Sequence, residues 1–451
     1  MAGLSEAKRR AMSVLMDQAP DEIIEAIETR FHRSDGGLAA DVVALARQER
    51  LERSVLRHAF GPVLGFMAPR RDGVPAPLFS RFAPKKVWAE VARRRPELTE
   101  NLTAMVQREA QLIAPAELAD KLCAEAASAI RSVDPSCLKL RSEAEADDLA
   151  AYFDMAPIAR SALVRLPEWL GRLDGEHLTT LRLAFKDADA VREDGRARLM
   201  EILMAHLPRA GEILRLIAGL TDQAGADFID GTEMASFPAR LLGHIELLAG
   251  RVQLGGPSLR GEEADQSVAN LVALSDLIRE FDVEFPGPAG GGWTQKLQTV
   301  RRRLTEVLEA AFNAAPKAVE AALPLGSTRL AGRMSRMAPD LKADPDSPAV
   351  HRARALLRVL AGARLAAAEL GCEGARRSVA QAVAERVDAY AEEALLMLHD
   401  GGVGDPVRAL ELIEVAAEFL GLSRNEEAGA LVRRRAAVAV ASDNGKDAAA
   451  A

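Results

Sequence analysis

The chain contains few aromatic residues and almost no cysteine for its length. Aromatic side chains make up 4% of the 451 residues, and only two of them are tyrosines, Tyr152 and Tyr390. A buried core must therefore be built from Leu, Ala, Val and Ile. The three cysteines, Cys123, Cys137 and Cys372, form no CxxC pair. Such a sparse, odd set argues against a secreted disulfide framework and predicts a reducing, cytoplasmic location.

Long apolar runs and strand-like alternation are also missing. No window approaches 18 uncharged apolar residues, so no transmembrane helix is predicted. The basic residues near the N-terminus precede only a short apolar segment at 11–16, which is too brief for a signal-peptide core. Helix-favouring residues dominate, and no run of four to eight residues alternates as a half-buried strand does. The sequence predicts an all-α fold, a multi-helix bundle or irregular α-solenoid built from antiparallel helical hairpins.

Recognisable catalytic and metal-binding motifs are absent. No two of the seven histidines lie three or four residues apart, so no metal site on a single helix is expected. The acidic stretches at 187–198 and 222–233 lack the ligand spacing of a calcium loop. No GxxxxGK[ST] element occurs, and the serine within 256–261 lacks the spacing of a nucleophile elbow. We therefore expect no catalytic residues, no metal and no cofactor, although an enzyme whose site residues come from distant helices would leave the same pattern.

The clearest periodic signal covers residues 293–323. Apolar residues recur there at alternate spacings of four and three, at Trp293, Leu297, Val300, Leu304, Val307 and Ala311. This spacing is typical of one helix face buried against other helices. Pro316 lies inside the pattern and is expected to kink the helix or to end it near Ala315.

Local start signals predict several other helices. Ser347-Pro348 and Asp405-Pro406 each combine an N-cap residue with a first-turn proline. Ser142 with Glu145, and Ser423 with Glu426, have the spacing of a capping box. The last hundred residues are therefore expected to form four helices of similar length that pack antiparallel.

Pro- and Gly-rich breaks suggest the organisation of the chain. The expected segments are N-terminal helices at 1–68, a basic Pro-rich loop at 69–86, a central helical region at 87–284, a break at 285–292, a C-terminal helical region at 293–442 and a disordered tail at 443–451. Whether the break at 285–292 separates two domains or only two helices is left open by the sequence.

The basic loop is the best candidate binding site. Its cations and aromatic residues, with Trp88 just beyond it, are Arg70, Arg71, Phe79, Arg81, Phe82, Lys85, Lys86 and Trp88. Such a set could bind phosphates, an anionic membrane surface or an acidic partner protein. It could equally be a solvated loop that its aromatic residues hold against the body of the protein.

The charge distribution helps to choose between these functions. The net charge of −8 argues against general nucleic-acid binding, while residues 1–110 hold 18 basic and 15 acidic side chains and leave room for a local anionic contact. The leading hypothesis is a cytoplasmic, non-enzymatic adaptor or scaffold that binds other proteins in grooves between helices. The alternatives are binding of nucleic acid or an anionic surface through residues 69–95, including Arg93, Arg94 and Arg95, and a helical enzyme with dispersed site residues.

Overall fold

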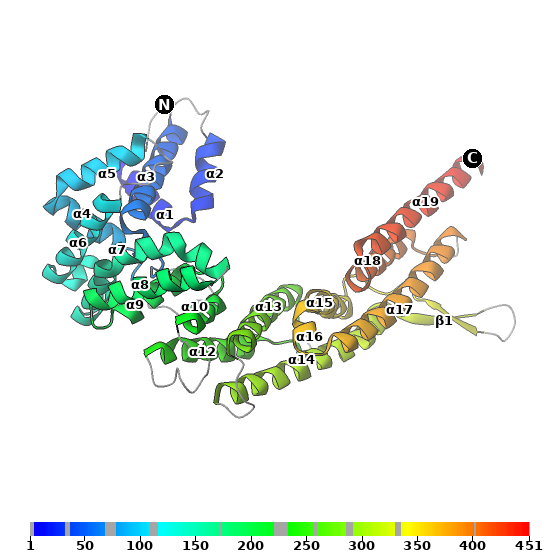
Figure 1. Cartoon of the computed structure of the whole chain (residues 1–451). Coiled ribbons are helices and arrows are strands. Elements are labelled where there is room, and N and C mark those ends of the chain that lie inside the picture. Colours follow the sequence, from blue (N-terminus) through cyan, green and yellow to red (C-terminus); the bar gives the residue numbers. More distant parts are fainter. Residues whose placement is uncertain are drawn as a thin grey trace. The chain divides into compact units, whose positions relative to one another are not determined.

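The computed structural model is almost entirely helical in the residues that it describes (Figure 1). These are 4–31, 37–67, 78–108, 116–171, 173–220, 233–256, 259–285, 292–329, 335–400 and 403–450. They contain 18 α-helices and one two-stranded sheet, which confirms the all-α class. None of the described helices combines the length and the apolar character needed to cross a membrane. Contacts divide the chain into two compact units, residues 1–222 and 223–451.

The first unit is organised around two long helices, α3 and α7. Helix α3 packs against α1, α2, α4, α5, α6 and α7, and α7 packs in addition against α8 and α9. The elements are α1 (Glu6–Gln18), α2 (Asp21–Phe31), α3 (Leu38–Leu64), α4 (Ala83–Arg94), α5 (Pro96–Arg108), α6 (Ala116–Ser132), η1 (Pro135–Leu138), α7 (Glu143–Gly171), α8 (Gly175–Val191), α9 (Gly195–His206), η2 (Ala210–Glu212) and α10 (Ile213–Leu220).

Scarce aromatic residues are gathered where α3 and α7 meet. Phe60 of α3 stacks edge-on against Phe153 of α7, with ring centroids 4.9 Å apart. The ring centroid of Phe66 lies 4.3 Å from that of Tyr152, and Phe79 makes edge contacts with both of these rings. Because aromatic pairs contribute beyond the area that they bury, this cluster anchors the chain just before α4 to the core.

The second unit is built around α14, α15, α17 and α18. Helix α14 packs against α15 and α17, and α18 packs against α15, α17 and α19. The elements are η3 (Glu233–Ala235), α12 (Ser236–Arg251), α13 (Gly261–Glu284), α14 (Gly292–Ala322), β1 (Leu325–Arg329), β2 (Ser335–Pro339), α15 (Pro348–Gly362), α16 (Arg364–Glu369), α17 (Glu373–His399), α18 (Pro406–Ser423) and α19 (Glu426–Ala450).

Helix α14 does not end at Pro316. It continues to Ala322, although Pro316 lies inside it. The buried face continues on both sides of the proline, with Phe312 and Ala315 before it and Val319 after it. The packing of this face against α15 and α17 offsets the backbone hydrogen bond that proline cannot donate. The predicted helix is confirmed, and of the two outcomes expected at Pro316, a kink or an end near Ala315, the end is excluded.

A β-hairpin follows α14, where the sequence predicted no strand. Strands β1 and β2 pair antiparallel, with Leu325 opposite Pro339 and Arg329 opposite Ser335. Neither strand alternates apolar and polar residues, so the usual sequence signal is missing. The hairpin is held instead by its backbone pairing and by packing of β2 against α17, which no local pattern reveals.

Two of the four predicted helix starts are confirmed in full. Ser347 accepts a hydrogen bond from the backbone N–H of Val350, and Asp405 accepts one from Arg408. Ser142 likewise accepts from the N–H of Glu145, but the Glu145 carboxylate accepts from Arg141 rather than closing a capping box on Ser142.

The capping box at Ser423 is wrong. Ser423 is the last residue of α18 and donates its hydroxyl to the carbonyl of Phe419. Asn425 occupies the start of α19 instead, where its side chain accepts from the N–H of Ala428 at 2.9 Å. Helix α19 then runs to Ala450, past residue 442 where the sequence predicted a disordered tail.

The break at 285–292 lies inside the second unit. Helices α13 and α14, on either side of it, both belong to residues 223–451, and residues 286–291 lie outside the described part. The rings of Phe285 and Trp293 face each other edge-on with centroids 6.1 Å apart. The division of contacts falls between residues 222 and 223, within the segment that the sequence treats as one central helical region.

Candidate functional site

Part of the predicted basic loop lies outside the described residues. Arg70 and Arg71 fall in the range 68–77, for which no structure is described. Two of the three aromatic residues that follow, Phe79 and Trp88, pack against other residues of the first unit. Phe79 is 4% exposed, and Trp88 is half-buried with its ring edge-on to Phe60 at 5.8 Å. These contacts support the interpretation in which the aromatic residues hold the segment against the body.

The cations of this segment differ in their surroundings. Lys85, near the start of α4, forms ion pairs with Asp17 at 2.6 Å and Glu49 at 2.8 Å. Arg81 lies over the exposed ring of Phe82, 4.7 Å from its centroid, and Lys86 is exposed. The structure therefore separates Lys85, whose charge is matched by acids of α1 and α3, from Arg81 and Lys86.

The three arginines at the end of α4 are also matched by acids. Arg93 and Arg94 both bind the Glu90 carboxylate, at 2.6 and 2.7 Å. Hydrogen bonding from Arg93, followed by that from Arg94, lowers the pKa of Glu90 from 4.5 to about 2. Arg95 pairs with Glu97 and Glu125, at 2.7 and 2.6 Å. Within 78–95, much of the basic charge is thus compensated locally.

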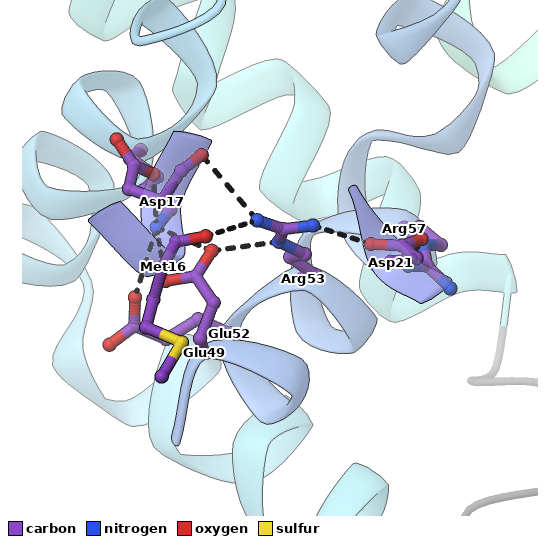
Figure 2. Close-up of polar contacts among 8 residues, drawn as sticks. Met16, Asp17, Asp21, Glu49, Glu52, Arg53 and Arg57 are labelled. Atoms are coloured by element: carbon purple, nitrogen blue, oxygen red, sulfur yellow. Dashed lines mark hydrogen bonds and ion pairs between the residues drawn. The ribbon is translucent and has the colours of Figure 1, made fainter. Parts of the chain in front are cut away.

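Arg53 of α3 is the centre of a polar network that joins the N-terminal helices (Figure 2). Its Nε donates to Glu49 at 2.7 Å, and its other nitrogens donate to the Met16 carbonyl at 2.8 Å and to the Asp21 carboxylate at 2.5 Å. One side chain of α3 therefore binds the C-terminal end of α1 and the first turn of α2. Arg57 adds a second bond to Asp21 at 2.5 Å.

Glu49 connects this network to α4. Glu49 is 5% exposed, and its carboxylate accepts from both Arg53 and Lys85. Burial by itself would lower the pKa of Lys85, but the hydrogen bonds to Asp17 and Glu49 outweigh it, and the pKa is raised. Burial and bonds to Glu49 and Asp21 compete in the same way at Arg53, whose pKa is also raised. Lys85 and Arg53 are therefore both charged at neutral pH.

This network forms one wall of an open groove of about 640 Å³. The acids that line the groove are Asp17, Asp21, Glu22 and Glu49, and the bases are Arg53, Arg57, Arg81 and Lys85. The numbers of acids and bases are equal, and most are already paired with one another. The lining is consequently a charge-balanced surface, suited to alternating polar contacts with a partner and not to concentrating phosphate.

Several large apolar side chains on the same helices are exposed. They are Val14 and Leu15 of α1, Ile23 and Phe31 of α2, and Leu38 at the start of α3, and each is between 46% and 61% exposed. Helices α1 and α2 each bury a single residue, Met16 and Ile24, in a small cluster with Ala46. The two helices thus attach through a small core and the Arg53 network, and leave much of their apolar surface in water.

A buried hydrogen bond in the first unit joins two other titratable groups, Tyr152 and Glu201. The Tyr152 hydroxyl donates to Glu201 at 2.5 Å, and the Arg198 guanidinium lies 4.8 Å from the centre of the Tyr152 ring. Burial, and then the charge of Glu201, raise the pKa of Tyr152. Hydrogen-bonded buried pairs of this kind satisfy core polar groups.

Among the described residues, no group of three or more His, Cys, Asp and Glu side chains is arranged to hold a metal ion.

Apart from Lys85, the residues of the Arg53 network and its link to α4 were not predicted from the sequence. The one local signal is the spacing of four between Glu49 and Arg53, which places both on one helix face. Asp17 and Asp21 carry no comparable signal, because they meet α3 and α4 only through the fold. Comparison with family models, curated proteins and solved structures finds no match for this chain.

Proposed function

We propose that the protein is a non-enzymatic, cytoplasmic helical adaptor or scaffold, and that it binds a partner protein through α1, α2 and the adjoining groove. The observation that carries this proposal is the exposure of Val14, Leu15, Ile23, Phe31 and Leu38 on α1, α2 and α3, the helices that also contribute acids to the charge-balanced groove. Exposed apolar side chains next to polar, paired charges are typical of protein-binding surfaces, in which an apolar centre is surrounded by a polar rim.

The partner that fits this surface best is an amphipathic helix. Helical proteins commonly bind a helix by its apolar face, with anchors spaced three, four or seven residues apart. The apolar side chains of α1 and α2 would contact that face, and the acids and bases of the groove would pair with charges along its edge. Polar complementarity of this kind contributes to specificity more than to affinity.

The test is affinity capture of partners by the full chain and by a variant with Leu15→Ser, Ile23→Ser and Phe31→Ser. We expect discrete proteins to be retained by the wild type and to bind the variant at least about tenfold more weakly, because a few apolar anchors dominate such interfaces. The matched control carries Val164→Ser and Leu183→Ser, which alter exposed apolar residues of α7 and α8. Equal capture by all three proteins, or no capture by the wild type, would contradict the proposal.

The competing proposal is binding of nucleic acid or an anionic surface through residues 69–95. Lys85 and Arg93 to Arg95 already have carboxylate partners, whereas Arg81 and Lys86 form no ion pair with another described residue. Charge reversal at Arg70, Arg71 and Lys86, which leaves the ion pairs of Lys85 with Asp17 and Glu49 in place, distinguishes the two. Loss of binding in this variant, together with a steep decrease in affinity at higher salt, would favour the anionic ligand. Capture that changes neither with the charge reversal nor with the salt concentration would favour the apolar surface.

A further inference from the structure

The β-hairpin and two helices of the second unit enclose a small pocket of about 230 Å³. Leu325 of β1 and Met337 of β2 line it from the hairpin, Val319 lines it from α14, and Tyr390 lines it from α17. The walls are mainly apolar, and Leu325 and Met337 remain 41% and 60% exposed. The pocket is therefore accessible to an apolar group of another molecule.

Tyr390 is the unusual member of this lining. Its side chain is 4% exposed, and its hydroxyl oxygen has no hydrogen-bond partner among the described residues. A buried hydroxyl without a partner destabilises the fold, so a group that supplies one gains binding free energy. Burial, followed by the charge of Asp340, raises the pKa of Tyr390. The phenol is thus protonated at neutral pH and can donate a hydrogen bond to an acceptor in the pocket.

Charges around the pocket favour a neutral ligand. Arg386 is paired with Glu320 at 2.9 Å, and Glu393 is paired with Arg336. Because these charges already have partners, the ligand need not supply an ion. The carboxylate of Asp340, whose charge acts on the Tyr390 hydroxyl, disfavours an anionic acceptor there. The acceptor that fits is a neutral carbonyl oxygen.

Pocket size limits the ligand to one group. An apolar cavity of roughly 150 Å³ accommodates benzene, and pockets for drug-sized molecules start at about 300 Å³. A volume between these values suits a single large apolar side chain. The pocket also adjoins β1, and within the described residues no third strand joins this sheet. The side of β1 that faces away from β2 therefore has backbone groups to which an extended segment can add.

We propose that this pocket binds one large apolar side chain of an extended polypeptide segment, while the Tyr390 hydroxyl donates to a neutral backbone carbonyl of the same segment. The segment runs beside β1, so that backbone hydrogen bonds provide affinity and the pocket selects the side chain. The site lies in a different unit from the α1–α2 surface and does not depend on the function proposed for that surface.

The two tyrosines of the chain make a direct test possible. The full chain is labelled with 3-fluorotyrosine and titrated with a blocked pentapeptide that has a central phenylalanine. Tyr390→Phe assigns the two fluorine resonances. We expect a saturable shift of the Tyr390 signal and no shift of the Tyr152 signal, since Tyr152 is buried in the other unit and bonded to Glu201. A peptide with a central alanine should give no shift.

Variants measured by fluorescence anisotropy of a labelled peptide separate the two contacts. Tyr390→Phe removes only the hydroxyl and should weaken binding by about 2- to 10-fold, the range of one net hydrogen bond. Ala389→Phe places a ring at the exposed rim of the pocket and should abolish binding. The matched control is Ala375→Phe, also exposed on α17 but roughly 21 Å away at a rise of 1.5 Å per residue, and it should bind as the wild type does.

Three results would overturn the proposal. The first is an unchanged Tyr390 resonance at saturating peptide, and the second is equal binding of the phenylalanine and alanine peptides. The third is equally tight binding of N-acetyl-phenylalanine amide, which lacks the extended backbone; this would show that the pocket takes a small neutral molecule instead of a polypeptide segment.

Discussion

Replacing Glu49 with glutamine tests whether the Arg53 network holds α1 and α2 on the first unit. Glutamine keeps the shape of the side chain and one acceptor oxygen but removes the charge that Arg53 and Lys85 share. These two cations would retain Asp21 and Asp17, at 2.5 and 2.6 Å. The substitution therefore weakens the network without leaving any cation unpartnered.

The size of the effect follows from burial. A hydrogen bond to a charged group contributes about 1.5–3 kcal/mol, and breaking a fully buried ion pair costs about 3–5 kcal/mol. Glu49 accepts from two cations, but the side chains of Arg53 and Lys85 are 18% and 29% exposed, and both keep other partners. We expect the attachment of α1 and α2 to weaken by about 2 kcal/mol, which raises the population of the opened state roughly 30-fold.

Hydrogen exchange of the full chain, followed by mass spectrometry, measures this directly. Peptides from residues 6–31 should exchange about 30-fold faster in Glu49→Gln, while peptides from α15 and α18 should be unchanged. Glu52→Gln is the matched control, because Glu52 is 46% exposed and lies 3.6 Å from Lys85. It should change exchange by less than about threefold, as exposed pairs contribute little. Equal effects of the two variants, or none in Glu49→Gln, would refute the role assigned to Glu49.

Two further predictions concern stability measured by urea unfolding of the full chain. Glu90→Gln should lower the free energy of unfolding by about 0.5–1 kcal/mol at pH 7, since the Arg93 side chain, one of its two partners, is 70% exposed. The folded-state pKa of Glu90 is lowered from 4.5 to about 2, so its contribution to stability is present above pH 4.5 and is lost as the pH falls towards 2. A difference in stability between wild type and variant that persists below pH 2 would show that the charge of Glu90 is not the cause. Gly429→Ala should cost about 1–3 kcal/mol, because an added Cβ would lie 2.4 Å from the Ala417 carbonyl oxygen. Its control Gly243→Ala, which meets nothing within 4 Å inside α12, should stabilise by about 0.5–1 kcal/mol; the same sign for both would refute the packing argument.

The candidate site was only partly predictable. The sequence drew attention to Lys85 because it lies in a run of cations, but its acidic partners Asp17 and Glu49 are distant along the chain. Phe79 was predicted as either a binding residue or an anchor, and its contacts with Phe66 and Tyr152 support the second interpretation. Tyr390 drew no attention as a site residue, because an isolated tyrosine in a helix gives no sign of whether its hydroxyl will find a partner.

The amino-acid sequence alone determined the all-α class, the helix at α14 and the helix starts at Ser347 and Asp405. These depend on interactions within one turn or one face of a helix, so nearby residues carry the information. The tertiary structure decided the rest. In the folded chain, Lys85 pairs with acids from two other helices, α14 continues past Pro316, and a hairpin forms beside Tyr390. Each of these depends on segments that meet only when the chain folds, where packing outweighs local preference.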